Sequence, residues 1–129
     1  MTGAASQWRR EIGEKIGSVY AENRKVAAVI LGGSTARGHA DRYSDIELGV
    51  FWRTPPSDEE RQAETDRMGV DLVRLYPYDP SEEVWADDLK AGRSDPALER
   101  SGALVEVVHH TTDFIDRFSR PCWRTMTLT

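Results

Sequence analysis

The sequence predicts an α/β (α+β) domain with a mixed, partly antiparallel sheet of about five strands flanked by helices on one side. Apolar residues recur at helical spacing near the N-terminus, and short apolar or alternating runs follow, separated by Gly- or Pro-containing segments. The length of 129 residues suits one domain. A composition of 39% hydrophobic and 30% charged residues excludes disordered chains and membrane-spanning bundles.

The N-terminal part predicts two helices and two strands. Helical spacing indicates an amphipathic helix over about 6–23, and the apolar run 26–31, which two glycines end, predicts a buried strand. A short helix over 34–40 is expected next, with Ser34 as its N-cap. The alternation over 45–52 predicts a second strand, on which Asp45 and Glu47 share one face while the apolar residues point to the core.

The remaining elements follow from caps and alternation. Ser57 and Glu60 have the spacing of a capping box, which predicts a polar, mostly solvated helix ending near Gly69. Strands are predicted over 70–76, 84–90 and 103–109, and a last helix over about 111–118. The end of the chain shows no periodicity. We therefore expect a domain over 1–118 and an irregular C-terminal tail over 119–129, which we interpret as the product of truncation or a frame shift.

Charge and composition restrict the partners. The net charge of −5 argues against a nucleic-acid partner and favours a small molecule. No apolar run is long enough to cross a bilayer or to form a signal peptide, so we expect a cytoplasmic protein without a membrane partner. The single cysteine, Cys122, cannot form an internal disulfide. His39, His109 and His110 lie at segment ends, where we expect surface or supporting roles.

A phosphate site is predicted where the first strand ends. Gly32 and Gly33 allow the backbone to approach an anion closely, and a helix that begins at Ser34 directs free N–H groups and its positive dipole end toward that anion. Ser34 adds a hydroxyl, and Arg37 adds a charged donor. A nucleoside triphosphate could bind at this turn.

A metal site is predicted beside it. Asp45 and Glu47 are two positions apart on a strand, so both carboxylates project to one side with backbone positions about 6 to 7 Å apart. That separation allows them to share a divalent ion, and oxygen ligands suit Mg²⁺. Two such ions, about 3.5 to 4 Å apart, can activate an attacking oxygen and stabilise a leaving pyrophosphate.

These residues resemble the nucleotidyltransferases of the DNA polymerase beta-like superfamily, of the antibiotic or minimal type. That signature is a Gly-Ser turn followed about ten residues later by Asp-x-Asp or Asp-x-Glu, and here Ser34 and Asp45 are 11 positions apart. The resemblance is specific over 29–51 and compatible to about residue 118, so 1–118 would be the catalytic domain. It implies Mg²⁺-dependent transfer of a nucleoside monophosphate from an NTP, with ATP preferred, to an acceptor hydroxyl. Gly33 and Ser34 would bind the phosphates, and Asp45 and Glu47 the metals.

The family carries a third carboxylate on a neighbouring strand, and two residues compete for that role. Glu106 is the preferred candidate, because it is the only acid in an apolar segment and burial there would suit a metal ligand or a proton-accepting base. Asp71 lies in a similar apolar context and resembles the corresponding segment of minimal nucleotidyltransferases. Both remain open at this point.

The acceptor and the partner are also open. Glu47 at the second acidic position resembles antibiotic nucleotidyltransferases, notably those that act on aminoglycosides, although such relatives continue into a helical C-terminal domain. One alternative is a minimal nucleotidyltransferase antitoxin that binds or modifies a small helical toxin. Another is a catalytically silent nucleotide-binding remnant. A homodimer is compatible with each of these readings.

Overall fold

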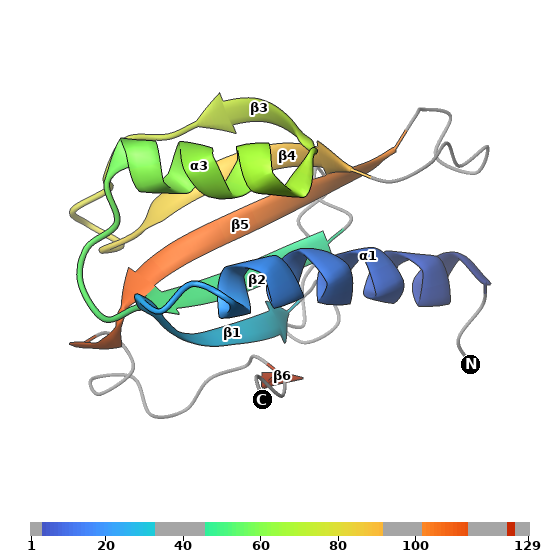
Figure 1. Ribbon diagram of the computed structural model, residues 1–129, viewed down its shortest axis with the longest axis horizontal. Coiled ribbons are helices and arrows are strands. Elements are labelled where there is room, and N and C mark those ends of the chain that lie inside the picture. Colours follow the sequence, from blue (N-terminus) through green and yellow to red (C-terminus); the bar gives the residue numbers. More distant parts are fainter. Residues whose placement is uncertain (1–3, 33–45, 92–101, 114–123, 126–129) are drawn as a thin grey trace.

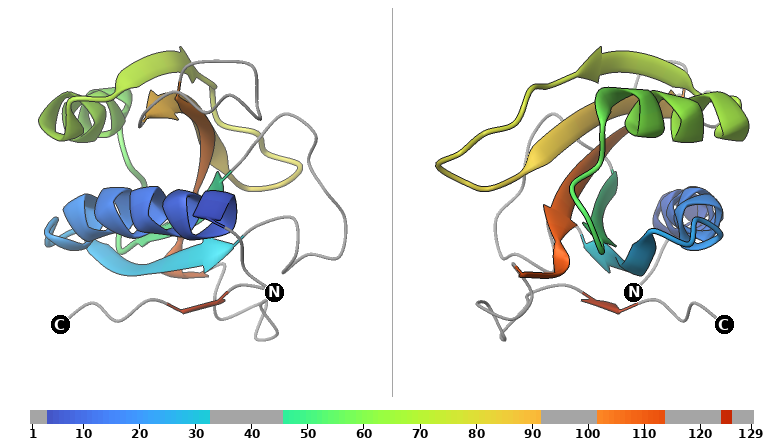
Figure 2. Two further views of the ribbon diagram at one scale, coloured as in Figure 1. Left: turned by 90° about the vertical axis from the view of Figure 1, so that its right-hand side faces the viewer. Right: turned by 60° about the vertical axis from the view of Figure 1, so that its left-hand side comes forward.

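The computed structural model describes residues 4–32, 46–91, 102–113 and 124–125. In these residues two helices, α1 (Ala4–Ala21) and α3 (Asp58–Met68), accompany a mixed sheet of order β3-β4-β5-β2-β1-β6 (Figure 1). Both helices lie on the same face of the sheet (Figure 2). The predicted α+β class and the mixed sheet of about five strands are therefore confirmed, with a very short sixth strand added at one edge.

Among the described strands one pairing is parallel, between β2 and β5, and the other four are antiparallel. In chain order the strands are β1 (Val26–Gly32), β2 (Ile46–Trp52), β3 (Asp71–Leu75), β4 (Trp85–Ala91), β5 (Ala103–Thr111) and β6 (Arg124–Thr125). The predicted strands agree with β1 to β5 to within one or two residues. Of the C-terminal tail expected over 119–129, only the two residues of β6 are described, and they pair with Ile30 and Leu31 of β1.

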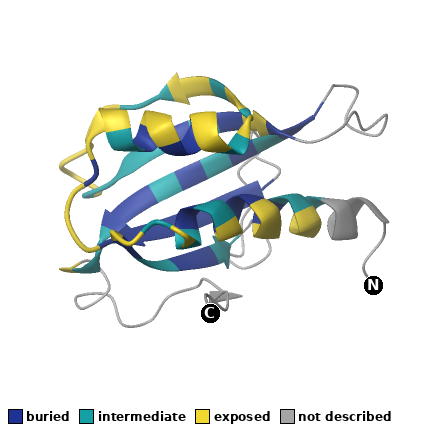
Figure 3. Cartoon of the chain, in the orientation of Figure 1, coloured by how far each residue is buried: buried dark blue, intermediate teal, exposed yellow. Residues whose placement is uncertain are grey.

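The apolar core lies between the sheet and the helices. Alternate residues of β2 and β5 face it, including the fully buried Leu48, Val50 and Val107, and α1 adds Ile16 and Tyr20. The strand β2 is buried along its whole length (Figure 3). Burying an aliphatic side chain of this size contributes about 1.5–3 kcal/mol. The alternation predicted over 45–52 is thus confirmed for the core-facing residues from Ile46 to Trp52.

The helix α1 approaches the sheet closely at one glycine. A Cβ added at Gly13 would lie 2.9 Å from Cδ1 of Leu31 and 3.3 Å from Cγ2 of Ile46. The absence of a side chain at position 13 therefore lets α1 settle onto β1 and β2. No helix in the described part of the chain combines the length and apolarity that a bilayer crossing requires.

The helix α3 begins and ends as its sequence predicts. The hydroxyl of Ser57 accepts a hydrogen bond from the backbone N–H of Glu60, whose carboxylate accepts one from the N–H of Ser57. Gly69 ends the helix with φ 71°, a left-handed conformation that glycine adopts without strain. The helix is mostly solvated, as expected, and only its inner face is buried. Arg61, Glu64 and Thr65 are buried there, because each has polar partners.

Candidate active site

A glycine and two carboxylates share one row across three neighbouring strands. Gly32, the last residue of β1, pairs with Glu47 of β2, and Glu47 pairs in parallel register with Glu106 of β5. Neighbouring strands lie about 4.8 Å apart, so these three backbone positions are consecutive steps along the hydrogen-bonding direction. The end of the predicted phosphate-binding strand thus adjoins one predicted metal ligand, which adjoins the other.

This row lies on the sheet face opposite the two described helices, α1 and α3. Leu48 and Val107 point to the helical core, so their neighbours Glu47 and Glu106 project from the opposite face. Glu47 is nevertheless 3% exposed, and Glu106 is half-buried. A carboxylate at such depth requires hydrogen bonds or cations around it. Carboxylate oxygens are also the donors that Mg²⁺ prefers, so the two residues fit the ion chemically.

The row continues into β4 with Asp88, which adds its carboxylate to those of Glu47 and Glu106. Asp88 pairs with Glu106, and its Oδ2 accepts a hydrogen bond of 3.0 Å from the hydroxyl of Tyr76. That hydrogen bond and the negative charge of Asp88 raise the pKa of Tyr76, with a smaller contribution from Glu106. Asp88 was not among the residues predicted from the sequence, because it follows another acid, Asp87, and so does not stand out as a lone acid in an apolar segment.

Asp71 does not join this row. It is exposed on the edge strand β3 and pairs with Lys90 of β4, which in turn pairs with Leu104. The strand of Asp71 is therefore separated from β5 by β4. Along the strands, Asp71 is level with Lys90, two residues away from the row. Of the two candidates for the third carboxylate, the register brings Glu106 beside Glu47 and leaves Asp71 apart.

Four further predicted site residues, Gly33, Ser34, Arg37 and Asp45, lie outside the described residues. Within the described ranges no group of three or more His, Cys, Asp or Glu side chains has the arrangement of a metal site. The predicted metal ligands are Asp45, Glu47 and Glu106, and only the two glutamates lie within the described ranges. His39 also lies outside these ranges.

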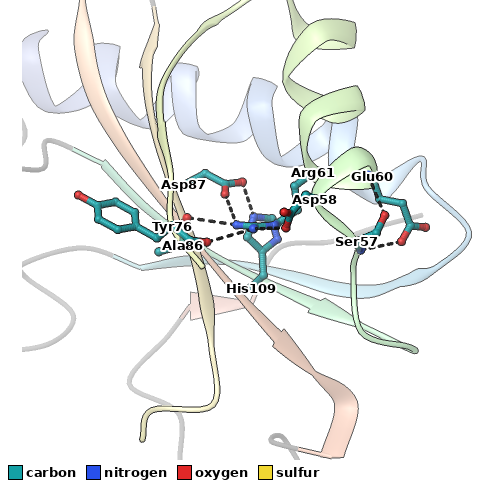
Figure 4. A network of polar contacts seen from close by, with 8 residues as sticks. All are labelled: Ser57, Asp58, Glu60, Arg61, Tyr76, Ala86, Asp87 and His109. Atoms are coloured by element: carbon teal, nitrogen blue, oxygen red, sulfur yellow. Dashed lines mark hydrogen bonds and ion pairs between the residues drawn. The ribbon is translucent and has the colours of Figure 1, made fainter. Parts of the chain in front are cut away.

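The core side of the same strands carries a buried polar network that the sequence analysis missed (Figure 4). Nε2 of His109 lies 2.7 Å from Oδ2 of Asp87, whose Oδ1 accepts a 2.6 Å hydrogen bond from Arg61. All three side chains have zero exposure. Of the two roles expected for His109, on the surface or in support of other residues, the surface role is therefore excluded by burial. His110 is also buried, and its ring stacks on that of Phe51 with the ring centroids 4.8 Å apart. Asp87 at a core-facing position of an alternating strand was the signal that could have revealed the network.

A buried tyrosine borders this network. The ring of Tyr20 packs edge-on against His109 at 5.7 Å, and no described residue bonds its hydroxyl. Burial raises the pKa of Tyr20 well above its ordinary value, and the negative charges of Asp87 and Glu64 raise it further, while Arg61 opposes them. The phenol is thus held in its neutral form.

Comparison with known proteins gives one informative match. The family model described as a nucleotidyltransferase domain matches residues 14–82, which is more than half of the chain. The match includes Gly32 through Glu47 and stops before β4, so Glu106 lies beyond it. No curated protein matches significantly.

Proposed function

Because the chain belongs to the nucleotidyltransferase domain family of the DNA polymerase beta-like superfamily, we propose that it transfers a nucleoside monophosphate from an NTP, preferably ATP, to a hydroxyl-bearing acceptor. One observation carries the proposal. The end of β1, Glu47 and Glu106 occupy consecutive positions in one row across the sheet. That row supports an arrangement in which phosphates, metal ligands and an acceptor hydroxyl meet.

Each residue of the site has a defined task in this proposal. Gly32, Gly33 and the hydroxyl of Ser34 bind the phosphates through the turn after β1, and Arg37 adds a charge-assisted hydrogen bond. The carboxylates that hold Mg²⁺ are Asp45, Glu47 and Glu106. When bound, two Mg²⁺ ions supply Lewis-acid neutralisation of the phosphate charge.

The reaction is an in-line displacement. The acceptor oxygen forms a bond to the α-phosphorus, the bond from that phosphorus to the oxygen bridging the β-phosphate breaks, and pyrophosphate leaves. A carboxylate oxygen of Glu106 takes the proton of the acceptor hydroxyl. The protein contributes mainly by positioning the reactants and by stabilising charge.

A small cationic acceptor, such as an aminoglycoside-like amino sugar, is the class that the described charges favour. Glu47, Glu106 and Asp88 place three carboxyl groups in one row on the sheet face opposite α1 and α3, in a chain whose net charge is −5. Opposite charge draws a cationic ligand toward such a face. The row does not favour an anionic acceptor such as a nucleic acid.

The test is incubation of the full chain with labelled ATP, Mg²⁺ and a panel of amino-sugar and protein acceptors. Asp45→Asn and Glu47→Gln should each lower transfer by at least about a hundredfold. Asp58→Asn is the matched control, because this exposed carboxylate lies on α3 at the other face and should leave transfer unchanged. Equal labelling by wild type and Asp45→Asn would refute the proposal. Labelling of a helical protein instead of a small molecule would favour the antitoxin alternative, and binding without transfer would favour the silent remnant.

A further inference from the structure

Two contacts fix the direction in which α1 crosses the sheet. A Cβ added at Gly13 would lie 3.3 Å from Cγ2 of Ile46, the first residue of β2. The ring of Tyr20, one and a half to two turns later in α1, packs against His109, which pairs with Val50 toward the other end of β2. The helix α1 therefore runs in the same direction as β2, and its N-terminal part extends beyond the start of β2 (Figure 1).

Arg9 lies one helical turn before Gly13, on the inward side of α1. Residues three or four positions apart share a face of a helix, and this face continues through Gly13, Ile16 and Tyr20, all of which are buried. Four residues of helix rise by about 6 Å, which is the length of about two residues of a strand. The backbone of Arg9 is therefore about level with the second position before Ile46.

This level lies just past the end of β1. Gly32, the last residue of β1, pairs with Glu47, which directly follows Ile46. The pairing is antiparallel, so positions before Ile46 are level with positions after Gly32. The Cα–Cβ bonds of a helix tilt toward its N-terminus, which directs the side chain of Arg9 further past the ends of both strands.

The guanidinium of Arg9 has an unused donor. Its Nε is buried, and no described residue accepts a hydrogen bond from it. A buried donor without an acceptor is costly, more so in a charged group, and a bound anion would remove that cost. Guanidinium nitrogens form paired hydrogen bonds to phosphate oxygens, a geometry that an ammonium group lacks. The neighbouring Arg10 is exposed.

We propose that Arg9 binds the triphosphate of the NTP, as a cation that α1 contributes from outside the segment 32–47. The inference rests on the part of the proposed function that has the phosphates bind where β1 ends. In this role the Nε of Arg9 and one of its terminal nitrogens donate hydrogen bonds to phosphate oxygens, and no proton is transferred. Loss of Arg9 therefore weakens the binding of the triphosphate.

The affinity is measured by calorimetry on the full chain with Mg²⁺ and α,β-methylene-ATP, in which no oxygen bridges the α- and β-phosphorus. Arg9→Gln should weaken binding by about tenfold or more, because charge-assisted hydrogen bonds are lost. Arg9→Lys should restore the affinity only in part. Arg10→Gln is the matched control, since it removes the same charge from the next, exposed position of α1. It should weaken binding by less than about twofold, because solvent and salt screen an exposed charge.

Inorganic triphosphate with Mg²⁺ is the second probe, because it lacks the base and the sugar. It should show the same difference between Arg9→Gln and Arg10→Gln. Equal affinities of these two variants for both probes would overturn the inference, and so would a loss in Arg9→Gln that is confined to the nucleotide. If Arg9→Gln does not fold, Arg9→Lys compared with Arg10→Lys decides the question in the same way.

Transfer from labelled ATP by the wild type is measured separately. A wild type that binds triphosphate through Arg9 without any transfer would refute the proposed function and support the inference. A wild type that transfers, with equal affinities in Arg9→Gln and Arg10→Gln, would refute the inference and leave the proposed function intact. A wild type that binds neither probe would refute both.

Discussion

Nη1 of Arg61 on α3 lies 2.6 Å from Oδ1 of Asp87 on β4, and neither side chain is exposed. The same guanidinium reaches Asp58, whose side chain is 73% exposed, at 3.0 Å. One arginine thus has a buried and an exposed carboxylate partner. The buried pair ties α3 to β4 and continues into His109, so it couples the helix to the strands behind the candidate active site.

Asp87→Asn should destabilise the protein strongly. The substitution leaves the charge of Arg61 without its buried partner, and breaking a buried ion pair costs about 3–5 kcal/mol. Asp58→Asn should cost less than about 1 kcal/mol, because the partner it removes is exposed to water. Urea denaturation followed by circular dichroism gives both values. Similar losses from the two variants would contradict the central place of Asp87 in the network.

Glu106→Gln and Asp71→Asn should separate the two candidates for the third carboxylate. Glu106 pairs with Glu47, whereas Asp71 is exposed on the edge strand and pairs with Lys90. We expect Glu106→Gln to lower transfer from labelled ATP by about a hundredfold or more. Asp71→Asn should change it less than about twofold. A larger loss from Asp71→Asn would assign the third carboxylate to β3.

Tyr20→Phe should leave stability at neutral pH unchanged or raise it by about 1 kcal/mol. The substitution keeps the buried ring and removes a hydroxyl that no described residue bonds, and an unsatisfied buried polar group is costly. Thermal unfolding at pH 7 measures the effect. Tyr78→Phe, at an exposed position, is the control.

Tyr20 should also make the free energy of unfolding fall at alkaline pH. The folded pKa of Tyr20 lies well above the ordinary 10.0, so above about that pH the unfolded chain ionises while the folded chain does not. The contribution of neutral Tyr20 to the free energy of unfolding is fully present below the pKa of the unfolded chain, and it is lost as the pH rises toward the folded pKa. Wild-type stability should therefore fall more steeply above pH 10.0 than that of Tyr20→Phe. Parallel pH profiles would contradict the assignment.

Glu60 should contribute to acid sensitivity. A hydrogen bond from Lys25 and then the backbone N–H of Ser57 lower its folded pKa below the ordinary 4.5. Its stabilisation is present above the unfolded pKa and is lost as the pH falls through the folded pKa. The difference in unfolding free energy between wild type and Glu60→Gln should shrink below pH 4.5. Glu59→Gln, at an exposed neighbouring position, is the control for the removal of one carboxylate from the first turn of α3.

Local signals in the sequence were sufficient for most of the elements. The capping box of Ser57 and Glu60 and the left-handed Gly69 lie at the predicted ends of α3, because caps depend on residues three or four positions apart. Alternation likewise identified β2 and its core-facing side. The buried charges escaped prediction. Arg61 looks like any solvated helix residue until β4 supplies its carboxylate.

The sequence by itself predicted the Gly-Ser turn and the Asp45–Glu47 pair, of which Gly33, Ser34 and Asp45 lie outside the described residues, and it determined the periodicities of the strands. All of these depend on short-range spacing. Only the tertiary structure decided that Glu106, and not Asp71, lies beside Glu47. It also decided that His109 is buried against Trp52 and Asp87. The physical reason is that strand register depends on contacts between residues far apart in the chain, and alternation is the same before and after a two-residue shift.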